Sequence, residues 1–497
     1  METELKFALS PEARKSVERH TGVHAVPHAD HTIYFDTPDL ALRKAGFTLR
    51  IRHRLGEESF VQNVKAPVPG GSPFQRQEWE WPVAGEQLEL DRLSEVPALP
   101  LLLAGDKERL KAVFRTEVER TKCVLSPSDG ARVELAIDEG VVAANGHREP
   151  LSDLEIELKE GPEEALYRLG LDLLRAAPLS LLMESKADRG YRLYDGSRPA
   201  ARKAQPITLD PGLGLHAAFV ALTDAVLDQL LANQPAALKG CEVEGIHQMR
   251  VAVRRLRSLL RLFEPCIEPH ARVRFEDELR RLGEVLGAAR DWDVFVAETL
   301  PAATDDGVGR DWIEPLRARA VEKQHAAHQA AKKVVLASGF SRFVLAFQAW
   351  SRCGEALMPD HLIDRQLAKV APGLLDRLAK KVGKRLVARD ADDAASLHAL
   401  RKDAKKLRYS IEFLNALYAP DSKGYLKSCD ALQKRLGDFN DLETTTRLAT
   451  ELSQDGHLDL APALGVVANW TKARRPKLLK RAEKACEAFA REKPFWQ

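Results

Sequence analysis

The chain has 497 residues, of which 44% are hydrophobic and 30% charged, and its formal net charge is +2. This length favours two or more domains with cores of their own, and the globular composition excludes a low-complexity chain. The six cysteines are scattered without zinc-type spacing, so we expect free thiols rather than a zinc site. The chain starts with an acidic segment and has no apolar run near the length of a membrane span. We therefore expect neither a signal peptide nor a membrane partner, and a cytoplasmic location.

Residues 1–200 predict strands with a few flanking helices. Charged residues recur at every second position in five segments, and side chains two apart on a strand point to the same face. One such strand is ordinary, but five strands with charges of both signs predict an antiparallel β-barrel around a wet interior. The charged faces are Glu2/Glu4/Lys6, Arg50/Arg52/Arg54, Arg76/Glu78/Glu80, Glu134/Asp138 and Glu155/Glu157/Lys159.

Two flanking helices are predicted from local signals. Ser10 and Pro11 supply an N-cap and a first-turn proline for a helix over 11–20, and an amphipathic pattern covers 163–176. A barrel lumen that holds basic and acidic groups together suits a polyphosphate chelated by a divalent metal ion, because basic groups bind phosphate oxygens and carboxylates hold the cation.

Glu2-x-Glu4-x-Lys6 resembles the signature of the CYTH superfamily, the triphosphate tunnel enzymes. Further matches follow in chain order at 34–43 (YFDTPDLALR), 48–52 (TLRIR), the strand of Lys65, Glu155-x-Glu157 and 185–191 (SKADRGY). A single short motif is weak evidence, whereas this ordered set covers about two hundred residues. A purely structural barrel with solvated charged faces is the alternative.

The resemblance implies metal-dependent hydrolysis of a triphosphate, with Mg²⁺ or Mn²⁺ as cofactor. Metal ligands are expected at Glu4, Glu155 and Glu157. Catalytic roles near the attacking water or a second metal ion are expected for Glu2, Glu134 and Asp138, together with Lys6, which also faces phosphate. Phosphate contacts are expected from Arg50, Arg52, Lys65, Arg120 and Lys186.

The sequence leaves open the roles of several other polar residues near these motifs. The strand face of Arg76, Arg115 and Lys122 is open from the sequence. Asp36 and Asp39 are expected in a turn or helix cap rather than as ligands. Arg43 and Lys44 could equally bind phosphate or lie on a solvated helix face.

A polar, proline-punctuated stretch precedes the second half of the chain, and we take 201–212 as the linker. Residues 213–497 predict an all-α domain with an internal repeat. The segment 246–257 (IHQMRVAVRRLR) matches 397–408 (LHALRKDAKKLR), at an offset of 151 (247 to 398). The segment 286–293 (LGAARDWD) matches 436–443 (LGDFNDLE), at an offset of 150 (287 to 437). A duplicated helical bundle is therefore predicted, and the fold class is α+β.

Each copy of the repeat carries a cationic stripe. On a helix the polar residues of the first copy fall within an arc of about 80°, with apolar residues on the other side. Like charges at this spacing destabilise a helix, and we expect no glutamate partner in register, which favours binding of an extended polyanion. The stripes are His247/Arg250/Arg254/Arg257 and His398/Arg401/Lys405/Arg408.

These helices and the paired Leu-Gly-x-x-x-Asp segments resemble the CHAD domain, a conserved-histidine α-helical domain. The resemblance covers roughly 212–497 and implies inorganic polyphosphate as a partner, and hence an association with polyphosphate granules. A metal site at His247 and His398 is disfavoured, because their stripe neighbours are cationic. His325 and His328 could pair on a helix, but we expect them on the surface.

The leading interpretation is hydrolysis of inorganic triphosphate to phosphate and pyrophosphate, with a polyphosphate-binding helical domain. Aromatic residues make up only 6% of the chain and form no evident nucleobase-binding cluster, so no specific nucleic acid is expected. Two alternatives stay open: a non-catalytic polyphosphate adaptor, and a hydrolase or cyclase acting on thiamine triphosphate or ATP. The sequence leaves the oligomeric state open.

Overall fold

The computed structural model describes residues 1–23, 25–127, 130–240, 242–304, 310–354, 358–390, 393–418, 421–454 and 460–496. These residues form two compact units. The first comprises Met1–Ala201, Gln234–Cys241 and Val335–Gly354, and the second comprises Arg202–Asn233, Glu242–Val334 and Glu355–Gln497.

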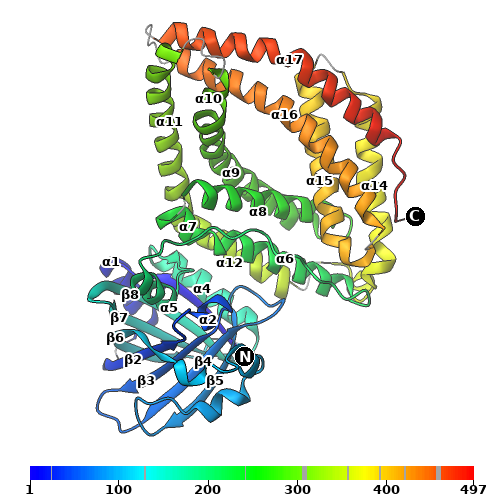
Figure 1. The fold of residues 1–497 in the computed structure, drawn as a ribbon. Coiled ribbons are helices and arrows are strands. Elements are labelled where there is room, and N and C mark those ends of the chain that lie inside the picture. The colour runs from blue at the N-terminus through cyan, green and yellow to red at the C-terminus, as the bar shows by residue number, and fades with distance from the viewer. Residues whose placement is uncertain are drawn as a thin grey trace. The chain divides into compact units, whose positions relative to one another are not determined.

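An antiparallel barrel dominates the first unit (Figure 1). The sheet has the strand order β5-β4-β3-β2-β6-β7-β8-β1-β9, and a further pairing of β5 with β1 closes it. The predicted closed barrel followed by a helical region is thus confirmed. The strands are β1 (Glu2–Ala8), β2 (His28–Asp36), β3 (Thr48–Arg54), β4 (Phe60–Pro67), β5 (Gln75–Val83), β6 (Lys111–Leu125), β7 (Arg132–Ala144), β8 (His147–Glu160) and β9 (Ser180–Leu181).

The main hydrophobic packing of the barrel lies on its outer face. Residues that alternate with the charged positions, such as Leu5, Leu135 and Ile156, are fully buried. Helices α1 and α4 pack on this side, and Ser10 caps α1 as predicted. The helical elements of this unit's first 201 residues are α1 (Pro11–Thr21), α2 (Ala41–Lys44), α3 (Leu99–Leu102), α4 (Glu163–Ala176), α5 (Lys186–Asp195) and the 3₁₀ turns Leu90–Glu95 and Lys107–Arg109.

Helix α5 packs inside one end of the barrel. Its Ala187 and Tyr191 join Tyr34, Phe114 and neighbouring side chains of β6, β7 and β8 in one buried cluster. Gly190 makes this approach possible, because a Cβ atom there would lie 2.1 Å from the Phe114 ring. The helix places Lys186, its first residue, next to the charged part of the lumen.

Two helices from beyond the predicted linker belong to the barrel unit. Helix α12 (Ser338–Cys353) packs against α4, where Leu345 reaches Gly170, and α7 (Gln234–Lys239) contacts the segment before α5. The division at 201–212 predicted from composition therefore misses two segments of this unit. Their amphipathic sequences do not reveal which unit they cover.

The second unit is helical, and it contains both copies of the sequence repeat. The helices of each copy pack pairwise, α8 on α9 and α15 on α16, and α8 also packs on α15. The helices of this unit are α6 (Leu215–Ala232), α8 (Glu242–Leu262), α9 (Pro269–Val294), α10 (Leu300–Ala303), α11 (Arg310–Leu336), α13 (Asp360–Ile363), α14 (Leu367–Val387), α15 (Ala394–Tyr418), α16 (Ser422–Gln454) and α17 (Ala461–Ala490), with a π-helical turn at Phe295–Thr299.

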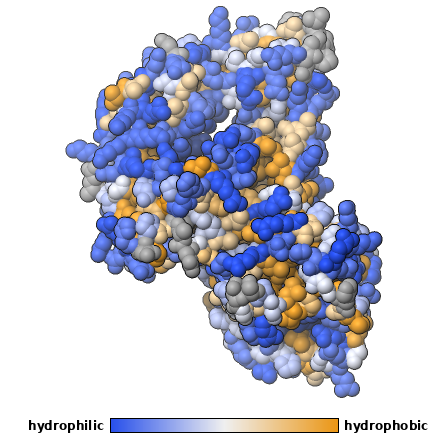
Figure 2. Space-filling model, turned by 180° about the vertical axis from the view of Figure 1, so that it is seen from behind, coloured by the Kyte–Doolittle hydropathy of each residue, from blue (hydrophilic) through white to orange (hydrophobic). Residues whose placement is uncertain are grey.

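One segment is more apolar than the sequence analysis expected. Leu215–Lys239, which spans α6 and α7, has the length and apolar composition of a membrane-spanning helix, but 61% of its apolar stretch is buried inside the protein. The helices Ile313–Leu336 and Ser338–Cys353 have the same length and composition only when they are taken together as one bent segment. The visible face in Figure 2 is mostly hydrophilic, with apolar residues in small groups.

Candidate active site

A network of charges joins five elements on the concave side of the barrel. Arg120 on β6 binds both oxygens of Asp138, its direct neighbour on β7, and also Glu155 on β8 at 2.6 Å. Lys186 of α5 contacts Glu155 at 2.5 Å and Asp138 at 2.6 Å, and Lys6 lies 3.7 Å from Glu155. A contact between β6 and β8 skips β7, which is possible because the sheet curves around these side chains. The network thus unites predicted phosphate-binding and acidic residues.

Burial and ion pairing oppose each other in this network. Burial alone raises the pKa of Glu155, but Lys186, Lys6 and Arg120 hold it well below its usual range. Asp138 follows the same pattern, with its pKa lowered by Lys186 and Arg120. Both carboxylates are therefore ionised and neutralised by cations that could otherwise bind phosphate.

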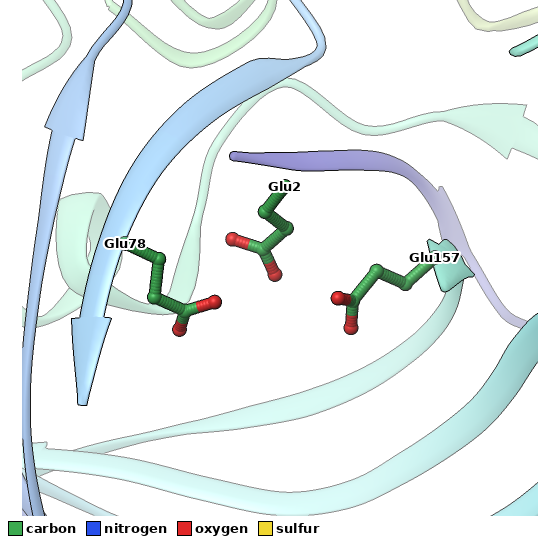
Figure 3. Close-up of side chains that lie close together, drawn as sticks. All are labelled: Glu2, Glu78 and Glu157. Atoms are coloured by element: carbon green, nitrogen blue, oxygen red, sulfur yellow. The ribbon is translucent and has the colours of Figure 1, made fainter. Parts of the chain in front are cut away.

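Three carboxylates converge elsewhere in the lumen (Figure 3). Glu2 on β1, Glu78 on β5 and Glu157 on β8 each offer an oxygen, and these atoms lie within 4.8 Å of one another. Lys65 contacts Glu2 at 2.6 Å and Glu78 at 3.4 Å. Burial raises the pKa of Glu157, whereas Lys65 and Arg50 lower that of Glu78 against the effect of burial.

This carboxylate cluster fits a hard divalent cation, because its donors are oxygens from separate rigid strands. Of the three predicted ligands, it contains Glu157. Glu4 pairs in register with Glu157 but its side chain contacts Lys6 at 3.2 Å, while Glu155 belongs to the Arg120 network. Burial and the nearby Glu155 raise the pKa of Glu4 to about 7.

The predicted arginines of β3 extend the lumen toward β4 and β5. Arg50 donates to Asn63 at 3.0 Å and lies 3.9 Å from Glu78, and Arg52 lies 3.4 Å from Glu80. The strand register explains these contacts, since Asn63 is paired with Arg50 on one side and with Glu80 on the other. The arginines are therefore held by acceptors but not locked in bidentate pairs.

The structure also shows which way the side chains of Arg76, Arg115 and Lys122 face. Lys122 faces the lumen and binds the predicted catalytic Glu134 at 2.8 Å. Arg115 is outside, with 61% of its side chain exposed and an ion pair to Glu117, and Arg76 donates to two backbone carbonyls of its own loop. Tunnel-facing roles are thus excluded for Arg115, and Arg76 is turned to the loop.

The polar residues around α2 serve local structure. The Asp36 carboxylate accepts the backbone amides of Thr37, Leu42 and Arg43, which confirms its predicted role in a helix cap. Asp39 accepts the Thr37 hydroxyl at 2.8 Å. Arg43 binds Asp195, and Lys44 is 68% exposed, so neither side chain joins the lumen networks.

Sequence reasoning missed one member of the carboxylate cluster. Glu78 was placed on a charged strand face together with Arg76 and Glu80, but no role followed from that. The signal was present, because a closed barrel brings the strand of residues 75–83 beside the strand of Glu2. His28 and Asp30 also face this side, 3.6 Å apart, and neither was singled out.

In the helical unit, the two cationic stripes converge where α8 packs on α15. Arg254 of α8 has its pKa lowered by burial and by Arg250 and Arg401, and Lys405 of α15 has its pKa lowered to about 6 by burial, Arg254, Arg401 and Arg250. These cations therefore influence one another across the contact between α8 and α15. We call Arg250, Arg254, Arg401 and Lys405 the cationic cluster.

The expectation of no glutamate partner in register is wrong at one position. Arg408 forms an ion pair with Glu412, one helical turn along, and also contacts Asp430 at 3.2 Å. Arg250 is also partnered, by Asp291 of α9 at 3.1 Å. Acceptors from the paired helix therefore neutralise part of each stripe, and a single-helix projection cannot show them. Arg257 is exposed at the surface.

One stripe histidine, His398, contacts the second motif of its own copy of the repeat. His398 shares a hydrogen bond of 2.6 Å with Asn440, and the pKa of His247 is lowered by burial and by Arg290, the repeat equivalent of Asn440. The surface expectation holds for His325, which is exposed, but is wrong for His328. His328 is 6% exposed and lies 2.8 Å from Asp293.

Comparison with known proteins agrees with this geometry for the barrel. The CYTH domain profile matches residues 1–191. An inorganic triphosphatase of Haemophilus influenzae is 26% identical over 200 residues, which are 39% of this chain and 54% of that protein. The chain thus spans about half the length of this curated relative.

The helical half also matches a known family, and some relatives span both halves. The CHAD domain profile matches residues 221–450. The crystal structure of the CHAD domain from the plant Ricinus communis is 34% identical, with a TM-score of 0.52, and the match covers 58% of this chain and 97% of that one. An uncharacterized protein of Mycobacterium tuberculosis is 26% identical over 443 residues, 82% of this chain and 79% of that protein.

Proposed function

Because the chain carries a CYTH domain at residues 1–191 and a CHAD domain at residues 221–450, we propose that it is a cytoplasmic, metal-dependent inorganic triphosphatase that also binds polyphosphate. The observation that carries the first part is the lumen itself. It places the Arg120 network beside a cluster of three carboxylates on separate strands. Cations for phosphate and oxygens for a hard metal ion are thus available in one barrel.

In this proposal the basic side chains hold the triphosphate. Arg50 and Arg52 offer planar donors to the phosphate oxygens, and Lys6, Arg120 and Lys186 turn from their carboxylate partners toward the substrate. Positive charge around the transferred group stabilises the charge that spreads over its oxygens in the transition state. The cost of breaking the ion pairs is offset because phosphate replaces each carboxylate.

The carboxylate cluster would hold the metal ion. Glu2, Glu78 and Glu157 supply oxygen ligands, and Lys65, which binds two of them, would contact phosphate instead. A bound Mg²⁺ or Mn²⁺ would polarise a phosphoryl oxygen and neutralise substrate charge. Among the other lumen acids, Glu134 and Asp138 stay candidates for orienting the attacking water.

Phosphate release from tripolyphosphate tests this function. Purified protein should release phosphate from tripolyphosphate in the presence of Mg²⁺ or Mn²⁺, with ATP and thiamine triphosphate as competing substrates in parallel. Faster turnover of either organic triphosphate would favour that substrate, and no turnover of the three would leave the adaptor function. Removal of the metal ion with a chelator should stop the reaction.

The second part of the proposal concerns the helical unit. The observation that supports it is the cationic cluster, which gathers basic residues from both copies of the repeat. A polyanion would supply the negative charge that Arg254, Arg401 and Lys405 do not receive from any carboxylate within ion-pair distance among the described residues. Binding of long-chain polyphosphate should need no metal ion and should weaken steeply with added salt, which titration calorimetry at two salt concentrations can measure.

A further inference from the structure

The segment between α4 and α5 links two lumen cations. Its short strand β9 pairs with β1 through Leu181 and Phe7, and the Leu182 amide donates to the Lys6 carbonyl at 2.8 Å. Lys186 follows at the first position of α5. The backbone position of this segment therefore determines the positions of the Lys6 and Lys186 main chains, from which their side chains extend.

Helices from beyond the predicted linker hold the same segment from the other side. The backbone N–H of Leu181 donates to the Ser341 hydroxyl of α12 at 2.8 Å. The side-chain amide of Gln234 on α7 donates to the Leu181 carbonyl at 3.1 Å. The Ser180 hydroxyl also donates to the Leu336 carbonyl. Side chains from α7 and α12 thus complete the hydrogen bonding of a strand that has only two residues.

A buried carboxylate provides a second attachment. Glu184 is 5% exposed, and its oxygens accept from Lys239 of α7 at 2.9 Å and from Arg192 of α5 at 2.9 Å. Burial raises the pKa of Glu184, but the hydrogen bonds and charges of Lys239 and Arg192 lower it overall. A buried charge is tolerated only when it is paired, so the ion pair fixes Glu184 two residues before Lys186.

We propose that Gln234, Lys239 and Ser341 are positioning residues of the tunnel, which hold β9 and Glu184 so that Lys186 and Lys6 reach the phosphate. This inference rests on the proposed triphosphatase function. A strand of two residues makes too few backbone bonds to stay in place unaided. A displacement of about 1 Å in a substrate-binding group is enough to impair a reaction strongly.

Kinetics of the full-length chain test the proposal. Lys239→Met and Ser341→Ala should each raise KM for tripolyphosphate by about three- to tenfold, with a smaller change in kcat, because lost hydrogen bonds of this kind change affinity by that order. Lys239→Arg keeps a charged donor and should restore much of the loss. The matched control is Arg352→Met, which removes a 3.0 Å contact between α12 and Glu163 of α4 without touching β9. It should leave KM unchanged.

A double-mutant cycle separates positioning from general destabilisation. In a Lys186→Met background, Lys239→Met should cause little further increase in KM, because the group that it positions is gone. An increase as large as in the wild-type background overturns the proposal.

Hydrogen exchange gives a readout that needs no activity. Amides of residues 178–186 should exchange faster in Lys239→Met and Ser341→Ala, and at the wild-type rate in Arg352→Met. Unchanged exchange in the first two variants also overturns the proposal. If the wild-type protein neither binds nor hydrolyses tripolyphosphate, the proposed function fails, whereas exchange still decides whether α7 and α12 hold β9.

Discussion

The barrel lumen and the cationic cluster of the helical unit differ in what faces their basic side chains. In the lumen, Lys65, Arg120 and Lys186 are bound to carboxylates at 2.6 Å or less. In the cluster, Arg254, Arg401 and Lys405 have no carboxylate within ion-pair distance among the described residues. A balanced lumen gains little from a bare polyanion, because each cation must leave an acid. A phosphate that arrives with a metal ion satisfies both signs of charge, whereas the cluster suits a polyanion alone.

The largest effect is expected from a change in the metal cluster. Glu157→Gln removes one of three converging carboxylates and should lower metal-dependent phosphate release by at least about 100-fold. Polyphosphate affinity of the helical unit should stay unchanged. Phosphate release across a metal titration measures the first effect, and calorimetry measures the second.

The matched control for Glu157→Gln lies on the same strand. Glu160→Gln alters a glutamate at the end of β8 that is 61% exposed and pairs with Arg132. It should keep wild-type activity. Near-normal activity and metal dependence of Glu157→Gln would contradict the metal assignment.

Changes in the cationic cluster should have the opposite effect, because they should weaken polyphosphate binding and leave hydrolysis intact. Charge reversal of Arg254 and Lys405 to glutamate should weaken polyphosphate binding by about 100-fold at 0.1 M salt and flatten its salt dependence, with tripolyphosphate hydrolysis retained. The full-length chain is required, because α7 and α12 belong to the barrel unit. Reversal of Lys380 and Lys384 on α14, outside the cluster, removes at least as much positive charge and serves as the control.

Unchanged polyphosphate affinity in the Arg254 and Lys405 variant would leave the cluster a structural feature. An equal loss in the α14 variant would instead indicate attraction by net charge alone.

A smaller effect is expected at Arg52. Arg52→Lys keeps the positive charge but loses the planar fork, so kcat/KM for tripolyphosphate should fall by about tenfold. Steady-state kinetics measure it, with Arg132→Lys as control, since Arg132 is half exposed and pairs with Glu160 at the exposed end of β8. Wild-type kinetics of Arg52→Lys would exclude bidentate recognition at this position.

The sequence predicted the barrel because its signal is local. Alternation of charge within each strand marked the lumen face, and it placed Arg50, Glu134 and Glu157 on that face. It could not show which carboxylates meet, since that depends on which strands close the barrel. The β1–β5 pairing brings Glu2 to Glu78, while Glu155 lies nearer to Arg120.

The helical half was predictable in outline for a different reason. The internal repeat marked α8 and α15, and their stripes do converge. Helix projection could not identify acids that approach from a neighbouring helix, as Asp291 does at Arg250, or an assignment of α7 and α12 to the barrel unit. Such contacts depend on tertiary packing, which a single periodic pattern does not encode.

The smallest expected effect is a dependence of polyphosphate binding on pH. Burial, Arg254, Arg401 and Arg250 lower the pKa of Lys405 to about 6, and Asp441 of α16 opposes them only in part. A bound polyanion favours the charged lysine, so binding above pH 6 takes up a proton, and affinity falls as pH rises. We expect the affinity to fall by about threefold per pH unit, below the limit of about tenfold for one linked proton.

Lys405→Arg stays charged over this range and should bind with less proton uptake, which calorimetry in buffers of different ionisation enthalpy measures at pH 7.5. This comparison also corrects for titration of the polyphosphate ends, which is the same for both proteins. Equal proton uptake by the two would show that Lys405 is already charged in the free protein or lies outside the binding surface.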